Sequence, residues 1–286
     1  MLKLLLHIVR SGKLRHTGFD FTERRARSLE GLKPFLLPGF ILKMPIRRFR
    51  HPVLRTFLAE AAYLKSSFGF RANHLSLSAP ALSYVRIPRS ASTALCKAML
   101  EHQFPDLKGH TLSSQQINHL ADAHTHRVLS GEDRDNVFFT LVRNPFARIV
   151  SVYRQFFERV HDPFLYDDYM FGILRRQMPF KDFVRIVRDI ADVLKDQHLK
   201  PQHRFLRYYE KSNTNVHILK VEQPDMVSAY LKKYGLKFEA FNLDPEPYDY
   251  RQYYDRQILE DVREIYQKDI SQFEYMNIYH ELRSYL

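Results

Sequence analysis

The sequence has almost no cysteine and no tryptophan. Its 286 residues include one cysteine, Cys96, so the chain cannot form an intramolecular disulfide or a cysteine-rich metal cluster. Nothing in the composition therefore requires an oxidising compartment, and a reduced cytoplasm is the expected location. The missing tryptophan implies no function, because phenylalanine and tyrosine bring the aromatic content to 14% and can fill the core.

Long hydrophobic runs are also lacking. The apolar stretch 35–42 contains Pro38 and Gly39 and is far shorter than the roughly 20 residues that a membrane-spanning helix needs. The apolar start of the chain, residues 1–9, is interrupted by polar residues and no small-residue cleavage site clearly follows it. We therefore expect no transmembrane segment and no signal peptide, and a cytoplasmic protein that is peripheral at a membrane if it binds one.

Positive charge is concentrated at the start of the chain. Residues 1–60 hold 13 Lys and Arg against 4 Asp and Glu, which accounts for +9 of the net charge of +12. The basic side chains include Arg24, Arg25, Arg27, Arg47, Arg48 and Arg50. Such a segment is typical of a surface that meets anionic lipid, an acidic glycan or nucleic acid, and equally of a solvated surface without a partner. We divide the chain into a basic segment of unassigned role, residues 1–75, and a main domain, residues 76–286.

Strand-like and helical patterns alternate beyond residue 75. Strands are predicted over 82–87, 137–142 and 216–221, and helices over 53–63, 93–100, 145–157, 181–194, 225–234 and 258–273. Pro145 suits the first position of its helix and Gly235 suits a C-terminal cap. The order of elements predicts an α/β fold of three layers, with a mostly parallel central sheet between helices.

The first predicted strand runs into the segment IPRSASTAL, residues 87–95. The N–H groups and the positive dipole end of the following helix attract anions, Arg89 adds a fixed charge, and nearby hydroxyls add donors. The segment predicts a P-loop-like phosphate loop without the glycines and lysine of the Walker pattern GxxxxGK[ST]. Its residues are Arg89, Ser90, Ala91, Ser92, Thr93 and Ala94. Taken alone, the same pattern is in most proteins only a helix cap.

The second segment is VRNPFARIVSVYR, residues 142–154. Arg143 leaves the end of a buried strand and Ser151 lies about two turns into the next helix, so both can reach one anion. Taken alone, the segment is better explained by Arg143, Arg148 and Arg154 as ordinary helix-flanking cations and by Ser151 as a packed small residue.

Together the two segments resemble the PAPS-dependent sulfotransferases (PAPS is 3′-phosphoadenosine 5′-phosphosulfate), especially the Golgi-type carbohydrate branch and its bacterial relatives. IPRSASTAL is similar to that family's 5′-phosphosulfate loop, and VRNPFARIVSVYR to its 3′-phosphate motif. The resemblance implies that Arg89 and the Ser90 to Ala94 backbone hold the 5′-phosphosulfate, while Arg143 and Ser151 hold the 3′-phosphate. Arg89 stands where lysine is commoner and Asn144 where aspartate is usual.

Two weaker similarities extend the resemblance to about residue 275. DQHLKPQHR, residues 196–204, resembles a His-x-x-Pro-Gln stretch of the chondroitin and related enzymes. VREIYQKDISQFEY, residues 262–275, resembles their closing Asp-x-x-x-Phe-x-Tyr element. The phosphosulfate loop is nearer to the uronosyl branch. These similarities imply a carbohydrate or glycolipid acceptor, with His198, Gln202 and Arg204 as acceptor-binding residues.

An acceptor hydroxyl needs a general base, and histidine has the most suitable pKa near neutrality. We rank His110 first, His198 second and Glu101 third, each with the alternative of an ordinary packed or solvated residue. His119, His124 and His126 complete no recognised metal site, and sulfuryl transfer requires no metal. PAPS is thus the expected donor substrate, without a metal cofactor.

Two other function classes stay open. A nucleotide-dependent, kinase-like P-loop enzyme shares the phosphate-loop logic, but the Walker glycines, the Walker lysine and Mg²⁺ ligands are missing. A basic nucleic-acid or membrane-surface binding protein would explain the N-terminal charge. If the chain is a sulfotransferase, no nucleic-acid partner is expected, and an anionic membrane surface is the candidate partner of the basic segment.

Overall fold

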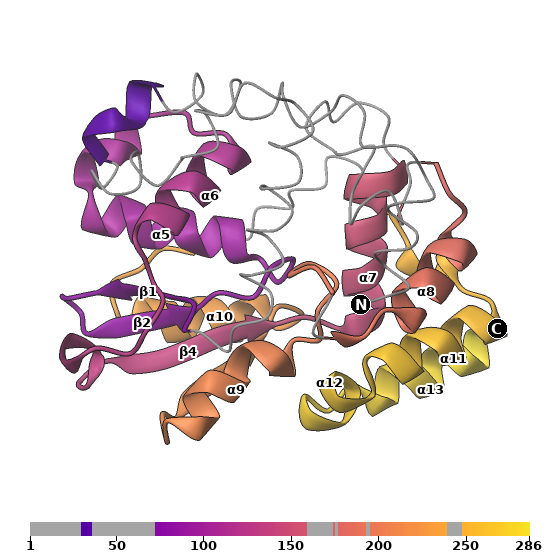
Figure 1. Cartoon of the computed structure of the whole chain (residues 1–286). Helices are drawn as coiled ribbons and strands as arrows, with labels where there is room; N and C mark the ends of the chain where they lie inside the picture. Colours follow the sequence, from indigo (N-terminus) through magenta and orange to yellow (C-terminus); the bar gives the residue numbers. More distant parts are fainter. Residues whose placement is uncertain (1–29, 36–71, 159–173, 175–176, 193–194, 239–247) are drawn as a thin grey trace.

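The computed structural model describes residues 30–35 and 72–286, with gaps at 159–173, 175–176, 193–194 and 239–247 (Figure 1). The helix predicted over 53–63 and the six arginines named above lie outside the described residues. Within them, a short 3-10 helix, η1 (Glu30–Phe35), comes first in the chain, and its Leu32 packs into a hydrophobic cluster with residues of α5 (Ser92–Gln103) and α6 (Ser114–Ala123).

A five-stranded sheet forms the centre of the molecule, in the order β3-β1-β2-β4-β5. The strands are β1 (His74–Leu77), β2 (Leu82–Val85), β3 (Thr125–His126), β4 (Val137–Val142) and β5 (Val216–Lys220). β2 pairs parallel with β4, and β4 parallel with β5, whereas β1 pairs antiparallel with both β2 and β3. The predicted α/β fold is confirmed. The sheet is mixed rather than mostly parallel, since β1 is antiparallel to both of its neighbours. The prediction differed because the short strands β1 and β3 were not recognised in the sequence.

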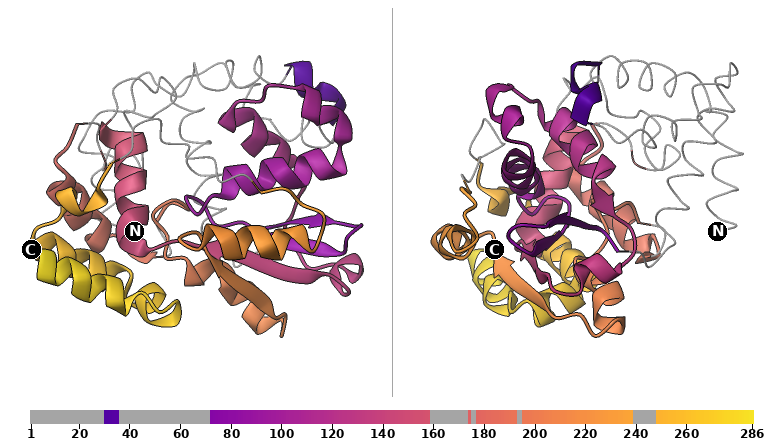
Figure 2. Two further views of the ribbon diagram at one scale, coloured as in Figure 1. Left: turned by 180° about the vertical axis from the view of Figure 1, so that it is seen from behind. Right: turned by 90° about the vertical axis from the view of Figure 1, so that its left-hand side faces the viewer.

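Helices cover both faces of the sheet (Figures 1 and 2). They are α5 (Ser92–Gln103), α6 (Ser114–Ala123), α7 (Pro145–Tyr153), α8 (Phe180–Asp189), α9 (His203–Lys211), α10 (Pro224–Lys232), α11 (Arg256–Ile265), α12 (Gln267–Gln272) and α13 (Met276–Tyr285). Short turns of helix connect them, namely η3 (Pro105–Gly109), η4 (Gly131–Asp133), η5 (Arg154–Glu158) and η7 (Tyr250–Tyr253). Among the residues described, none of the helices combines the length and the apolar character needed to cross a bilayer.

The alternation of side chains along β4 explains the three layers. Phe139 and Leu141 pack into one hydrophobic cluster with residues of α5, α6 and α10. Phe138 and Val142 pack into the other with residues of α7 to α9 and α11 to α13. Successive side chains of a strand point to opposite faces, so an almost wholly apolar strand requires cover on both sides.

Two predicted helix boundaries are confirmed. Pro145 is the first residue of α7, and the Asn144 side chain caps this helix by accepting from Phe146 N. Gly235 follows α10 with φ 71°, a left-handed conformation that glycine adopts without steric cost. The predicted helix 258–273 is instead divided into α11 and α12, and the break falls at Tyr266.

Candidate active site

The two segments singled out in the sequence meet at one edge of the sheet. β2 and β4 are parallel neighbours, with Val85 opposite Thr140, so the loop after β2 and the residues after β4 leave the sheet at the same edge. Ligands of open α/β sheets bind outside the carboxyl ends of the strands. This edge is therefore the candidate active site.

The loop between β2 and α5 has an unusual backbone. Arg89 has φ 67° and Ala91 has φ 55°, both in the left-handed region. This conformation costs a residue with a Cβ atom about 1–2 kcal/mol, so the surrounding contacts must hold the loop in place. Ala91 is the N-cap of α5 and offers no side-chain cap to the first N–H groups of the helix. Uncapped N–H groups at a helix start are the donors that bind an anion.

Arg89 and Ser151 lie together. The Arg89 guanidinium donates to the main-chain oxygen of Ser151 at 3.0 Å, to its hydroxyl, and to the side-chain oxygen of Gln155. The structure thus joins the first segment to the second through side chains 62 residues apart in sequence. Gln155, in η5, had not been singled out in the sequence.

Gln202 connects the loop to the end of β4. Its Oε1 accepts from Arg143 N at 2.9 Å and from the Ser90 hydroxyl at 3.0 Å, and its Nε2 donates to Arg143 O at 2.7 Å. The Arg143 guanidinium, in turn, donates to Arg89 O at 3.4 Å. Gln202 is completely buried, and its contact with an acceptor stays a prediction. Its three side-chain hydrogen bonds hold the Ser90 hydroxyl and the backbone of Arg143 in place.

Arg148 is a further residue that sequence reasoning missed. It is 1% exposed, and its guanidinium donates to Pro88 O at 3.0 Å, Lys200 O at 3.0 Å and Gln197 O at 3.3 Å. Burial lowers the pKa of this guanidinium, which still stays charged because arginine is so strongly basic. The sequence signal was an arginine within a helix that is otherwise almost wholly apolar.

The Asp-x-x-x-Phe-x-Tyr element at 269–275 makes hydrogen bonds to residues that position the candidate active site. Asp269 is fully buried and accepts from Gln202 N at 2.6 Å and from His203 N at 2.9 Å. Tyr275 donates to Glu222 at 2.8 Å, and Glu222 accepts from Asn144 N at 2.7 Å. These contacts hold the start of α9 and the start of α7 in place.

Asn144 uses its amide in two ways. Its oxygen caps α7, and its Nδ2 donates to the Tyr250 hydroxyl at 3.1 Å. An ionised aspartate could keep the cap and would accept from the Tyr250 hydroxyl instead of donating to it.

The candidate bases lie in different places. His198 is held by Asp196, whose carboxylate is 2.7 Å from its Nδ1, and its ring lies edge-on to Phe156 with 4.9 Å between centroids. Gln197 and Pro88, the residues just before His198 and Arg89, are bridged by the single guanidinium of Arg148. The backbone just before His198 therefore lies close to the backbone just before Arg89 of the phosphate loop.

His110 is not brought there. It follows η3 as the C-cap residue, and its ring contacts Phe35, which also contacts Phe104 just after the C-terminal end of α5. The phosphate loop is at the other end of this helix, about 16 Å away by helix rise. Glu101 pairs with Lys97 along the same helix, one turn before its end.

The remaining predicted residues frame the site. Thr93 accepts from Asn118 Nδ2 of α6 at 3.3 Å, Ser92 begins α5, and Ala94 is buried. Arg204 is 24% exposed and donates to Asp192 at 3.0 Å. Burial also lowers the pKa of Lys200, whose backbone oxygen accepts from Arg148.

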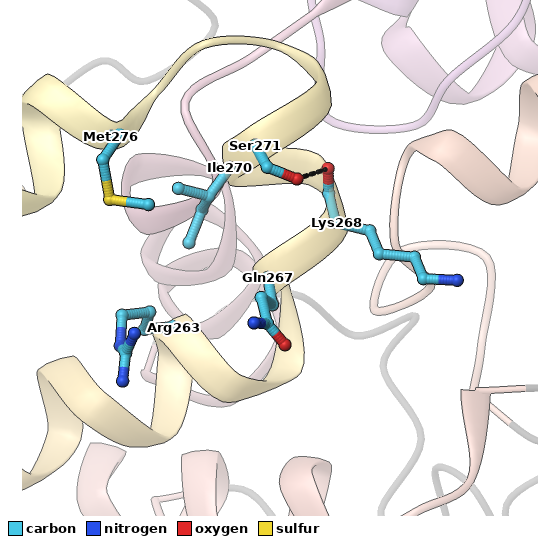
Figure 3. Close-up of a pocket in the computed structure, with 6 residues that line it drawn as sticks. All are labelled: Arg263, Gln267, Lys268, Ile270, Ser271 and Met276. Carbon is cyan, nitrogen blue, oxygen red and sulfur yellow. Dashed lines mark hydrogen bonds between the residues drawn. The ribbon is translucent and has the colours of Figure 1, made fainter.

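One open pocket, of about 340 Å³, lies elsewhere (Figure 3). It is lined by residues of the C-terminal helices α11 to α13, namely Arg263, Gln267, Lys268, Ile270, Ser271 and Met276. None of these residues belongs to the two segments, so the pocket is not part of the candidate active site.

Comparison with known proteins identifies the family. The model of the sulfotransferase family matches residues 78–276, which include both segments and the closing element. The chain belongs to the sulfotransferase family. No curated protein and no solved structure matches it. Members of this family transfer a sulfuryl group, so the chain is a transferase that uses a sulfate donor and an acceptor.

Proposed function

We propose that this sulfotransferase takes the sulfuryl group from PAPS and transfers it to a hydroxyl of a carbohydrate acceptor. The observation that carries the proposal is the junction of the two segments, in which Arg89 contacts Ser151 and Gln202 binds both Ser90 and Arg143. A donor with phosphate groups at two positions needs two anion-binding centres held at a fixed separation, and the contacts of this junction support that role.

The 5′-phosphosulfate would bind at the start of α5. The uncapped N–H groups of this helix and the Arg89 guanidinium supply the positive charge that such a group requires. Sulfuryl transfer needs in-line geometry and charge stabilisation more than covalent catalysis. In the proposed reaction the acceptor oxygen forms a bond to sulfur while the bond from sulfur to the phosphate oxygen breaks. Arg89 then neutralises the charge that develops on the leaving nucleotide.

The 3′-phosphate would bind to Arg143 and Ser151. Arg143 leaves β4 beside the loop, and its guanidinium contacts Arg89 O. The Ser151 hydroxyl oxygen accepts from Arg89, which leaves the hydroxyl hydrogen to donate to a phosphate oxygen. We keep both residues as the phosphate ligands because they line one junction.

We assign His198, rather than His110, as the general base. Asp196 is buried and is positioned to accept from Nδ1–H, which leaves Nε2 of His198 to accept the proton of the acceptor hydroxyl. The His198 side chain is 25% exposed, so an acceptor can reach it. His110 lies at the far end of α5 and has no such carboxylate partner among the described contacts.

A carbohydrate acceptor is favoured by the surroundings of His198. The stretch 196–204 resembles the chondroitin and related enzymes, and it carries the partly exposed cation Arg204. Partly exposed tyrosines, among them Tyr208, offer a stacking surface for a sugar ring. Acidic glycans are the preferred class because the cations outnumber the carboxylates in this stretch.

Transfer of labelled sulfate from PAPS to a set of acceptors tests the proposal. We expect transfer to acidic glycans, a loss of about 100-fold or more in turnover for His198→Ala, and near-normal turnover for His110→Ala, which replaces an exposed histidine of the same chain. Donor affinity should change little in either variant. Transfer only to phenols or simple alcohols would contradict the carbohydrate acceptor, and a greater loss for His110→Ala would contradict the choice of base.

A further inference from the structure

A second cluster of histidine and carboxylate side chains shares no residue with the candidate active site. His74 begins β1, His126 ends β3, and Asp133 ends η4. One atom of each, a ring nitrogen or a carboxylate oxygen, lies within 4.8 Å of the corresponding atoms of the other two. The three residues come from three separate segments of the chain, so the fold itself assembles the cluster.

The distances within the cluster suit a tetrahedral ion. Asp133 Oδ1 lies 3.1 Å from His74 Nε2 and 3.4 Å from His126 Nδ1. Zinc binds nitrogen and oxygen ligands at about 2.0–2.1 Å, so two ligands at the corners of its tetrahedron are separated by about 3.3–3.4 Å. The two rings, with centroids 5.1 Å apart, flank the same carboxylate oxygen.

The side chains are oriented by a second set of hydrogen bonds. Asp133 Oδ2 accepts from Ser130 N at 2.8 Å and from its hydroxyl at 2.9 Å, and Oδ1, which lies beside the two rings, also accepts from the Ser76 hydroxyl at 3.1 Å. His74 Nδ1 is 2.9 Å from the Tyr209 hydroxyl, which accepts from Asn73 N at 2.8 Å. Metal-binding histidines commonly have their other ring nitrogen fixed in this way, and metal-binding carboxylates are themselves hydrogen-bonded.

Burial differs across the cluster in the way that a metal site with one open position requires. The His74 side chain is 0% exposed and that of Asp133 is 2% exposed, whereas that of His126 is 36% exposed. An ion can therefore enter beside His126, and a water molecule can take the fourth corner from the same side.

We propose that His74 Nε2, His126 Nδ1 and Asp133 Oδ1 bind one divalent zinc-type ion. The ion would connect the start of β1 and the end of η4 with β3, and it would stabilise this part of the sheet rather than take part in sulfuryl transfer. With a proton on His74 Nε2 in place of the ion, the same arrangement is a hydrogen bond to Asp133. The site is independent of the proposed donor and acceptor.

Titration of the chelator-treated full chain with zinc distinguishes a zinc-binding cluster from a cluster held only by the hydrogen bond between His74 and Asp133. We expect calorimetry to show one tight site per chain, zinc to raise the thermal unfolding temperature, and cobalt to give the visible absorption of a tetrahedral ion. His126→Ala removes a partly exposed ligand, so the variant should fold and bind zinc at least about 10-fold more weakly. His217→Ala, which removes an exposed strand histidine outside the cluster, controls for the other 13 histidines and should bind like the wild type. Equal titration curves for the wild type and His126→Ala, including no binding in either, would overturn the proposal and leave the hydrogen bond as the explanation.

Discussion

Replacing Gln202 tests whether one buried amide holds the two halves of the active site together. In Gln202→Ala the Ser90 hydroxyl, Arg143 N–H and Arg143 C=O lose their partner. Each buried polar group left unpaired costs about 1–3 kcal/mol, so three of them should lower the free energy of unfolding by about 3 kcal/mol or more. Because Gln202 is completely buried, water cannot replace its amide without a rearrangement of the loop.

Urea unfolding measures this loss, as a shift of the transition midpoint at constant slope. Gln223→Ala is the matched control, since Gln223 is exposed and precedes α10 without capping it, and it should stay within about 0.5 kcal/mol of the wild type. The Gln202 variant should also bind the donor nucleotide about 10-fold or more weakly, because the loop and the end of β4 lose their fixed separation. A change in unfolding free energy below about 0.5 kcal/mol would refute the assignment of Gln202 as the connection.

Two further predictions follow from the same structure. Arg148→Met should lower the free energy of unfolding by about 2–4 kcal/mol in the same urea assay. Three carbonyls lose a charged donor, and this cost is only partly offset because a charge no longer has to be buried. An unchanged midpoint would contradict the bridging role of Arg148. Removal of residues 1–60 should preserve donor binding but abolish co-sedimentation with anionic vesicles, since that segment carries +9 of the net charge; equal sedimentation of both forms would exclude the membrane as its partner.

Much of the central sheet could be predicted from the sequence because its strands are apolar and long enough to be distinctive. The predicted strand 137–142 coincides with β4, and the strand 216–221 differs from β5 by one residue. β3 escaped prediction because its two residues are too few to establish an alternation of side chains, and β1 because the polar residues His74 and Ser76 make up half of its four residues. The break between α11 and α12 carries no glycine or proline that would mark it.

The two anion-binding segments were predictable as local motifs, but the contacts that join them were not. Gln202 and Ser90 are 112 residues apart, and nothing in either local sequence indicates that they form a hydrogen bond. The ranking of His110 above His198 followed its position after the first helix, whereas the structure places that position at the far end of α5. Roles that depend on a partner distant in sequence become visible only when the fold is known.

Binding of the desulfated product nucleotide, 3′-phosphoadenosine 5′-phosphate, tests the central claim most directly. Calorimetry should compare it with adenosine 5′-phosphate, which lacks the 3′-phosphate, in the wild type and in Arg143→Ala. Bonds between charged groups contribute about 1.5–3 kcal/mol, so the wild type should prefer the 3′-phosphorylated nucleotide, and Arg143→Ala should weaken that nucleotide about 10- to 100-fold and leave the other nearly unchanged. No binding of either nucleotide to the wild type, or an equal loss for both in Arg143→Ala, would contradict the account.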